Sequence, residues 1–193
     1  VVSLLDVILS FVMGRNIFDF YEGDMSQVMI TLFLLTIYGI MVGGISQMRE
    51  IVKEQDIYRR ERLVNLKILP YVLSKIWVAA LLALYQAVAY TVVHYLSFTM
   101  PGGILEFFQI YITMTLATFA GMMLGLFASA LAPNSSSAPL LVIILMLPQI
   151  VLAGALIPVP SFVSAPFSTR WAFESLIAIS GSGSDVAADV CWA

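Results

Sequence analysis

The sequence predicts an all-α membrane protein, a polytopic bundle of helices that cross a lipid bilayer. Of its 193 residues, 61% are hydrophobic and 11% are charged, whereas soluble domains carry roughly a quarter charged residues. Five long apolar stretches stand out, and crossing roughly 30 Å of hydrocarbon takes about 20 helical residues. Open sheets leave backbone groups unsatisfied in lipid, and barrel strands would alternate over about ten residues, so these stretches are expected to be helices.

The expected spans follow one another with short connectors, at about 1–18, 26–47, 72–98, 105–131 and 137–157. Within the first span, Asp6 is expected near the cytoplasmic interface. Glu106 begins the fourth span, where the helix dipole favours an anion, and Pro148 should kink the fifth. The segment 161–180 is too short to span and is expected to be an external re-entrant or interfacial helix. The chain starts inside an apolar stretch without a basic leader, so it is interpreted as part of a longer protein.

The basic residues predict the orientation. Seven of the nine lie between Arg49 and Lys75, and the positive-inside rule makes the connector 49–75 cytoplasmic. The spans then alternate, which puts the turn at 100–104 and the C-terminal segment outside. We expect an integral protein of the plasma or inner membrane, in contact with membrane lipid.

The connector holds the strongest local signal. Seven charges fall within KEQDIYRRER, residues 53–62, in a segment with helical periodicity. One interpretation is an amphipathic helix on anionic lipid. Because acidic residues are mixed with the basic ones, a cytoplasmic docking element for a protein partner is favoured.

The same stretch resembles a known signature. Glu54-Gln-Asp-Ile-Tyr-Arg-Arg-Glu-Arg62, followed by Tyr71 and Lys75, resembles the E-R-P-V-F-x-R-E-R…Y…x-x-K pattern of G-type ATP-binding-cassette exporters, of type 2 permease architecture. The matching positions are Glu54, Arg60, Glu61, Arg62, Tyr71 and Lys75. Two further blocks are similar to the family in the same order, Ser129–Asn134 with Ala138, Gly154, Ile157 and Pro158, and Arg170–Leu176. The resemblance covers nearly the whole chain.

The resemblance implies a transmembrane half with six helices, of which this chain would hold the first five. It implies a dimer of halves and a nucleotide-binding domain that contacts the loop after the second helix. That loop would form a connecting helix at about 49–60 and a coupling helix at about 61–68. The residues expected to couple the two domains are Glu54, Arg60, Glu61 and Arg62.

The family's substrate cavity also maps onto this chain by resemblance. Its lining positions fall on Gly39, Val42, Met146, Leu147 and Ile150, and its leucine valve on Ala155 and Leu156. Val42 stands where drug-exporting members have an aromatic clamp, and Gly39 replaces a polar residue. An aliphatic cavity is more compatible with a lipid or another flexible hydrophobe.

No cofactor or catalytic site is predicted within the chain itself. The sequence has no G-x-x-x-x-G-K-[ST] loop, so ATP and magnesium are expected on a nucleotide-binding domain in the same polypeptide or a separate subunit. It has no His, Cys and carboxylate cluster at metal-ligand spacing, and no nucleic-acid partner is expected. His94 is interpreted as an interfacial or bundle-packed histidine, with a proton relay as the alternative.

Two further interpretations compete with the exporter. A non-transporting scaffold or accessory subunit of a larger membrane complex would use 49–75 as its docking site, and an intramembrane enzyme is disfavoured because polar groups do not cluster. The spacings Gly39-x-x-x-Gly43 and Gly121-x-x-x-Gly125 predict close helix packing.

Overall fold

The computed structural model describes residues 2–15, 17–18, 25–62, 67–99, 103–153 and 160–180. Its elements are α1 (Val2–Met13), α2 (Met25–Gln47), the 3-10 helix η1 (Val52–Glu54), α3 (Gln55–Arg62), α4 (Ile68–Ser97), α5 (Ile104–Leu131), α6 (Ala138–Val151), α7 (Ser161–Ser164) and α8 (Ser168–Ile179). Every regular element in the described ranges is a helix, which confirms the predicted all-α class for this part of the chain.

Three segments are long and apolar enough to cross a membrane, namely Ser26–Glu54, Ile68–Ser97 and Ile104–Leu131. They contain the stretches predicted at 26–47 and 105–131 and all but the last residue of the one predicted at 72–98, so the predicted helical membrane bundle is confirmed. α1 and α6 are shorter, with 12 and 14 residues, and the count of five spans stays a prediction.

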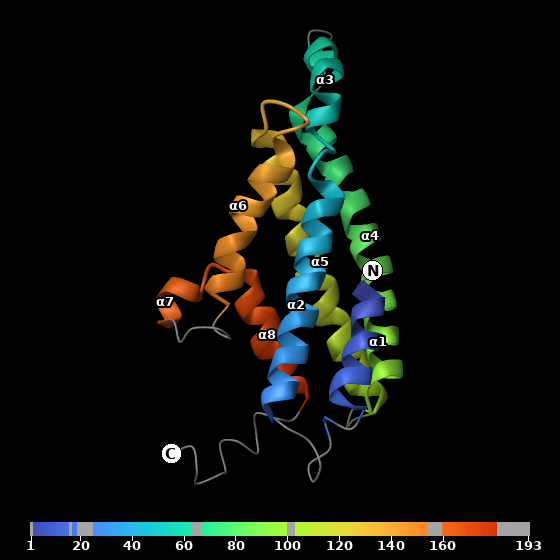
Figure 1. Ribbon diagram of the computed structural model, residues 1–193. Helices are drawn as coiled ribbons and strands as arrows, with labels where there is room; N and C mark the ends of the chain where they lie inside the picture. The colour runs from blue at the N-terminus through green and yellow to red at the C-terminus, as the bar shows by residue number, and fades with distance from the viewer. Residues whose placement is uncertain are drawn as a thin grey trace.

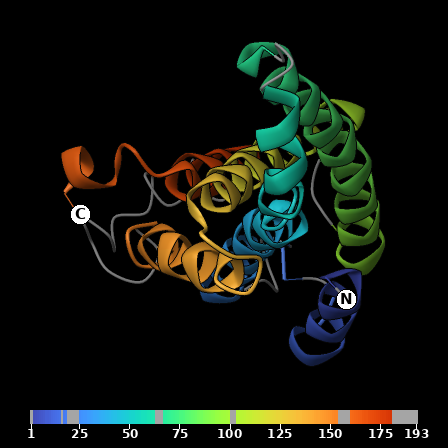
Figure 2. The ribbon, with the colours of Figure 1, turned by 90° about the horizontal axis from the view of Figure 1, so that it is seen from above.

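The long helices α2, α4 and α5 run side by side (Figure 1). α4 lies to one side of the α2–α5 pair and α6 to the other (Figure 2). α3 extends from one end of the bundle, which we call the connector end. α1 and α8 lie along the opposite half, which we call the distal half (Figure 1).

Glycines hold α2 and α5 in close contact. A Cβ atom on Gly121 would lie 2.8 Å from the Cα of Ile40, and one on Gly125 would lie 3.0 Å from the Cα of Gly44. Gly43 faces α5 in the same way, with the backbone nitrogen of Met122 3.1 Å from a Cβ built on it. Because lipid tails are themselves apolar, the hydrophobic effect does not drive helices together within a membrane. Van der Waals packing at close backbone contacts holds them together instead. The close helix packing predicted from the glycine spacing is confirmed.

The ends of the helices follow from local chemistry. α1 ends at Gly14, whose φ of 91° suits the left-handed conformation that closes a helix, and its N–H donates to the carbonyl of Ser10. At the start of α5, the Glu106 carboxylate accepts a 2.6 Å hydrogen bond from the Gly103 N–H, as expected for an anion at a helix N-terminus. Pro148 lies inside α6, which ends three residues later at Val151.

The segment predicted at 161–180 contains α7 and α8, and α8 is a packed part of the bundle. It contacts α2 and α5 and buries Ala172, Phe173 and Leu176. The carboxamide oxygen of Gln149 in α6 accepts hydrogen bonds from the Thr169 N–H at 3.3 Å and the Thr169 hydroxyl at 2.6 Å. A side chain of α6 thus accepts hydrogen bonds from the first turn of α8, whose N–H groups have no acceptor within the helix.

α1 packs against α4 and brings two distant polar residues together. The Asp6 Oδ1 lies 3.8 Å from the His94 Nδ1. His94 lies one turn from the end of α4 that is remote from the connector, so Asp6 lies in the distal half of the bundle. Asp6 and the connector therefore cannot both lie at the cytoplasmic interface, and the side that each faces stays a prediction. His94 is fully buried, which agrees with a bundle-packed histidine.

Candidate functional site

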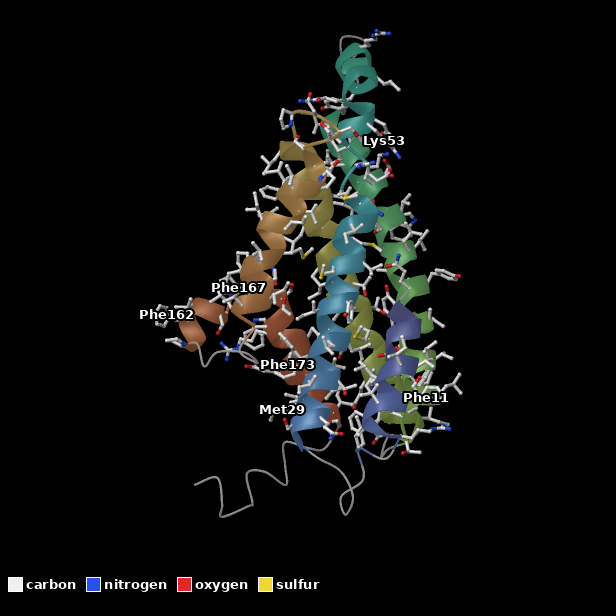
Figure 3. The ribbon with its side chains drawn as sticks, viewed as in Figure 1. Phe11, Met29, Lys53, Phe162, Phe167 and Phe173 are labelled. Carbon is white, nitrogen blue, oxygen red and sulfur yellow. The ribbon has the colours of Figure 1, made fainter. Side chains whose placement is uncertain are left out.

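The charged connector protrudes from the bundle. α4 has 30 residues and is therefore about 45 Å long, which exceeds the roughly 30 Å of hydrocarbon. α2 has 23 residues, enough to cross before η1 begins. α3 extends beside the start of α4, where the rings of Tyr58 and Tyr71 lie 5.0 Å apart. Lys53 marks this end in Figure 3, and Phe11 and Met29 mark the other.

An ion-pair network fixes η1 to α4. The Glu54 carboxylate binds the Lys75 ammonium at 2.7 Å and accepts a hydrogen bond from the Tyr71 hydroxyl at 3.0 Å. Glu50 binds Lys75 at 3.6 Å and Lys53 at 2.6 Å. Glu54, Tyr71 and Lys75 are all positions of the exporter signature, and the structure brings them together.

The network also holds Glu54 in its charged form. The hydrogen bond from Lys75 lowers the pKa of the Glu54 carboxyl, the hydrogen bond from Tyr71 adds to this, and partial burial opposes it. A lowered folded-state pKa means that the stabilisation is present above the unfolded value, about 4.3 for Glu, and is lost as the pH falls through the folded value. The network is therefore intact at neutral pH.

A buried serine fixes η1 to α5. The Ser129 hydroxyl oxygen accepts hydrogen bonds from the N–H groups of Ile51 at 2.9 Å and Val52 at 3.0 Å, and Ser129 is 1% exposed. The first N–H groups of a helix have no partner within it, so a side chain from α5 acts as the cap of η1. Ser129 belonged to the second block of the resemblance and continues the Gly121-x-x-x-Gly125 pattern predicted to pack helices. A capping role was not predicted for it, because nothing in the sequence shows that the two segments meet.

Replacing Ser129 by alanine is expected to loosen η1 without unfolding the bundle. The buried N–H group of Val52 and the partly buried one of Ile51 would lose their acceptor, which costs about 1–2 kcal/mol. Hydrogen exchange of the Ile51 and Val52 amides should become several-fold faster, roughly as that free energy implies. Ser137→Ala is the matched control, because the hydrogen bonds of the Ser137 hydroxyl within the described residues are local ones to the backbone of Asn134. Unchanged exchange at Ile51 and Val52 would contradict the role of Ser129.

The predicted coupling residues extend from this network onto α3. Arg60 is exposed on α3, at the protruding tip of the connector. Glu61 and Arg62 also belong to α3, but their side chains lie outside the described residues. The predicted connecting helix 49–60 corresponds to η1 and most of α3, and the predicted coupling helix 61–68 falls largely on 63–66, outside the described residues.

The predicted cavity residues take different positions on α2 and α6. Gly39 is buried in the α2–α5 contact, where a Cβ atom would lie 2.9 Å from the Met114 methyl group. Met146 is 4% exposed and faces α2 at Gly44. Val42 and Ile150 are partly buried against the central core, and Leu147 is 55% exposed. The predicted valve residues, Ala155 and Leu156, lie outside the described residues.

α6 presents an apolar outer face around Leu147. Its exposed members are Leu140, Ile143, Ile144, Leu147 and Val151. Among the described residues, no three His, Cys, Asp or Glu side chains lie close enough together to hold a metal ion. Such a face can contact lipid, another helix or a hydrophobic ligand, but it offers no polar group for catalysis.

The bundle and its protruding connector define a helical membrane domain with a charged extension at one end. The chain matches the model of the ABC-2 type transporter family over residues 1–177 and belongs to that family. It is also 27% identical over 154 residues to the ABC transporter ATP-binding/permease protein Rv1747 of Mycobacterium tuberculosis (strain ATCC 25618 / H37Rv). That match covers 75% of this chain and 18% of the relative, so the chain spans under a fifth of the relative's length.

Membership confirms the ABC transporter resemblance. The chain is a transmembrane part of an ABC transporter and an integral membrane protein, and the family implies partnership with a nucleotide-binding domain. The Mycobacterium relative is, by its name, one protein with both ATP-binding and permease parts.

Proposed function

We propose that the chain is the membrane half of a G-type ATP-driven exporter, which moves a hydrophobic or amphipathic substrate by alternating access. ATP and magnesium would bind the nucleotide-binding domain, in the same polypeptide or a separate subunit. The observation that carries the proposal is the double attachment of the connector, to α4 through Glu54 and Lys75 and to α5 through Ser129.

This attachment supports a mechanical role. η1 follows α2 in the chain, is ion-paired to α4 and is capped by α5, so a displacement of α3 would reach three long helices at once. The glycine contacts between α2 and α5 leave little room for sliding, since a packed interface moves as a unit. A push on α3 from a nucleotide-binding domain would therefore tilt α2, α4 and α5 together.

The surface next to α2 and α6 supports the proposed substrate class. Leu147 and the outer face of α6 are aliphatic, and Val42 occupies the position of the family's aromatic clamp. These side chains offer no aromatic ring on which a flat substrate could stack. We propose that two halves pair along α2 and α6 and enclose a cavity for a lipid or similarly flexible hydrophobe. In this arrangement residues 49–75 face the cytoplasm of a plasma or inner membrane.

Replacing Arg60 by alanine is expected to uncouple the transporter. Arg60 lies at the exposed tip of the connector, where its proposed role is to contact the nucleotide-binding domain. Its replacement should therefore leave the bundle intact. Substrate-stimulated ATPase activity of the full transporter in nanodiscs should fall roughly tenfold or more, which corresponds to about 1.4 kcal/mol of lost coupling. Membrane insertion should be unchanged.

Glu174→Gln is the matched control for this experiment, because Glu174 is a partly exposed charged residue on α8, away from the connector. Normal stimulation in the Arg60 variant would count against the coupling role. The competing scaffold interpretation requires no ATPase partner. A full-length gene and gene neighbours that lack a Walker motif would overturn the exporter proposal.

A further inference from the structure

A groove runs between α5 and α8 in the distal half, where the two helices pack against each other (Figure 1). Its volume is about 520 Å³, within the range of about 300–1,000 Å³ that is usual for small-molecule sites. The residues that line it are Gln109, Ile112 and Thr113 of α5 and Ser175, Ala178 and Ile179 of α8. None of these six belongs to the connector, α2 or α6, so the groove is separate from the proposed coupling path and from the predicted substrate cavity.

The groove borders a face of α5 that is exposed and apolar. Phe108, Ile112 and Leu116 follow one another at intervals of four residues, so they share one face of the helix, and they are 55%, 56% and 62% exposed. α5 is long and apolar enough to cross a membrane, and the proposed pairing of two halves uses α2 and α6. This face is therefore expected to contact bilayer lipid, which makes a lipid molecule the most abundant candidate ligand for the groove.

The polar side chains of the groove are rich in hydrogen-bond acceptors. The Thr113 hydroxyl donates to the backbone carbonyl of Gln109 at 2.9 Å, and the Ser175 hydroxyl donates to the backbone carbonyl of Trp171 at 2.7 Å. Each hydroxyl has a single hydrogen, so both keep only lone pairs for a ligand. The Gln109 side chain is exposed, and its carboxamide offers a further acceptor oxygen together with two N–H donors. A ligand that donates several hydrogen bonds therefore fits this lining.

A negative charge lies beside the groove. Glu106 precedes Gln109 by three residues, so the two side chains are neighbours on the surface of α5, and the Glu106 carboxylate lies at the start of that helix. On α8, the guanidinium of Arg170 is ion-paired with Glu174 at 2.6 Å, so its charge is balanced locally. The six lining residues of the described structure include no basic side chain. The groove thus favours a cationic group over an anionic one.

We propose that this groove binds a phospholipid with a primary amine in its headgroup, such as phosphatidylethanolamine. The ammonium group carries a positive charge and three N–H donors, which match the acceptors of the lining and the neighbouring Glu106 carboxylate. The quaternary ammonium of phosphatidylcholine carries the same charge but has no N–H donor. The acyl chains of the bound lipid lie along Ile112 and Leu116. Because the lipid contacts both walls of the groove, it holds α5 and α8 together and is not itself the transported substrate.

Native mass spectrometry of the full transporter in detergent tests the inference by measuring how tightly the first lipid binds to each chain. Phosphatidylethanolamine and phosphatidylcholine with the same acyl chains are compared, so that only the headgroup differs. The wild type is expected to bind the ethanolamine lipid about tenfold more tightly or better, because choline cannot donate the charge-assisted hydrogen bonds. Equal affinities for the two lipids, or tighter binding of the anionic phosphatidylglycerol, would overturn the proposal. This comparison requires no variant.

Two threonines of α5 provide matched variants that locate the site. Thr113 lines the groove and Thr115 does not, although the Thr115 hydroxyl makes an equivalent hydrogen bond, to the backbone carbonyl of Tyr111 at 2.8 Å. The Gln109→Leu/Thr113→Val double variant should reduce the preference for the ethanolamine lipid to about twofold or less, and Thr115→Val should keep the wild-type preference. A full preference in the double variant, or its loss in Thr115→Val, would show that the lipid does not bind in this groove.

Discussion

Replacing Gly121 by valine is expected to break the close packing of α2 against α5, so that the protein no longer forms a stable bundle. The new Cβ atom would lie 2.8 Å from both the Cα and the carbonyl carbon of Ile40, so the two backbones would have to separate. Overpacking against backbone costs roughly 3 kcal/mol or more, a large part of the stability of a domain. Denaturation in mixed micelles, together with gel filtration of the detergent-solubilised protein, measures the loss.

Gly103→Ala provides the matched control for this prediction. A Cβ atom there would lie 3.5 Å from the Glu106 carboxylate, an ordinary van der Waals contact, so the control variant should unfold like the wild type. A Gly121→Val protein that was as stable as the control would show that α2 and α5 are not in close backbone contact.

Replacing Lys75 by methionine is expected to disconnect the connector from α4. Lys75 is the cation that both Glu54 and Glu50 contact, and methionine keeps much of its aliphatic length without the charge. Of its two side-chain partners, Lys75 and Tyr71, the Glu54 carboxylate would keep only the Tyr71 hydroxyl. The Glu54 side chain is 32% exposed. We expect a local loss of about 1–2 kcal/mol, and a fall of substrate-stimulated ATPase activity by roughly tenfold or more in the full transporter.

Lys75→Arg is the matched control, because it retains the positive charge and should retain most of the stimulation. Hydrogen exchange separates the coupling effect from general unfolding. In the methionine variant, exchange should increase in η1 and α3 while the α2–α5 amides stay protected. Full ATPase stimulation in the methionine variant would contradict the role of the Glu54–Lys75 pair.

The fold class could be predicted from the sequence because the membrane leaves few alternatives. Uninterrupted apolar stretches such as 105–131 must be helical in lipid, and the observed α5 differs from that prediction by a single residue at its start. The start of α4 was predicted less well, at 72 instead of Ile68. Pro70 lies in the first turn of α4, where proline is tolerated, so the helix begins before it.

Contacts between distant segments could not be predicted in the same way. Ser129 and Val52 are 77 residues apart in the sequence, and neither residue type indicates that the two are in contact. The position of Asp6 beside His94 could not be predicted either, because alternation of the spans gives the direction of α1 but not its depth beside α4. The resemblance did indicate Glu54, Tyr71 and Lys75 as a group, and the structure supplies the physical reason, a carboxylate that binds both of the other side chains.

The central claim is that a nucleotide-binding domain acts on this chain through α3, and cross-linking tests it most directly. Ile57 is 58% exposed on α3, so an Ile57→Cys substitution in a Cys191→Ser background would place a single reactive thiol on the connector of the full transporter. The same substitution at Glu174 supplies a control thiol on α8. We predict a cross-link from position 57 to the nucleotide-binding domain, with a yield that changes between the ATP-bound and nucleotide-free states, and none from position 174. A thiol at position 57 that reacts with the reagent but yields no cross-link in either nucleotide state would contradict the account.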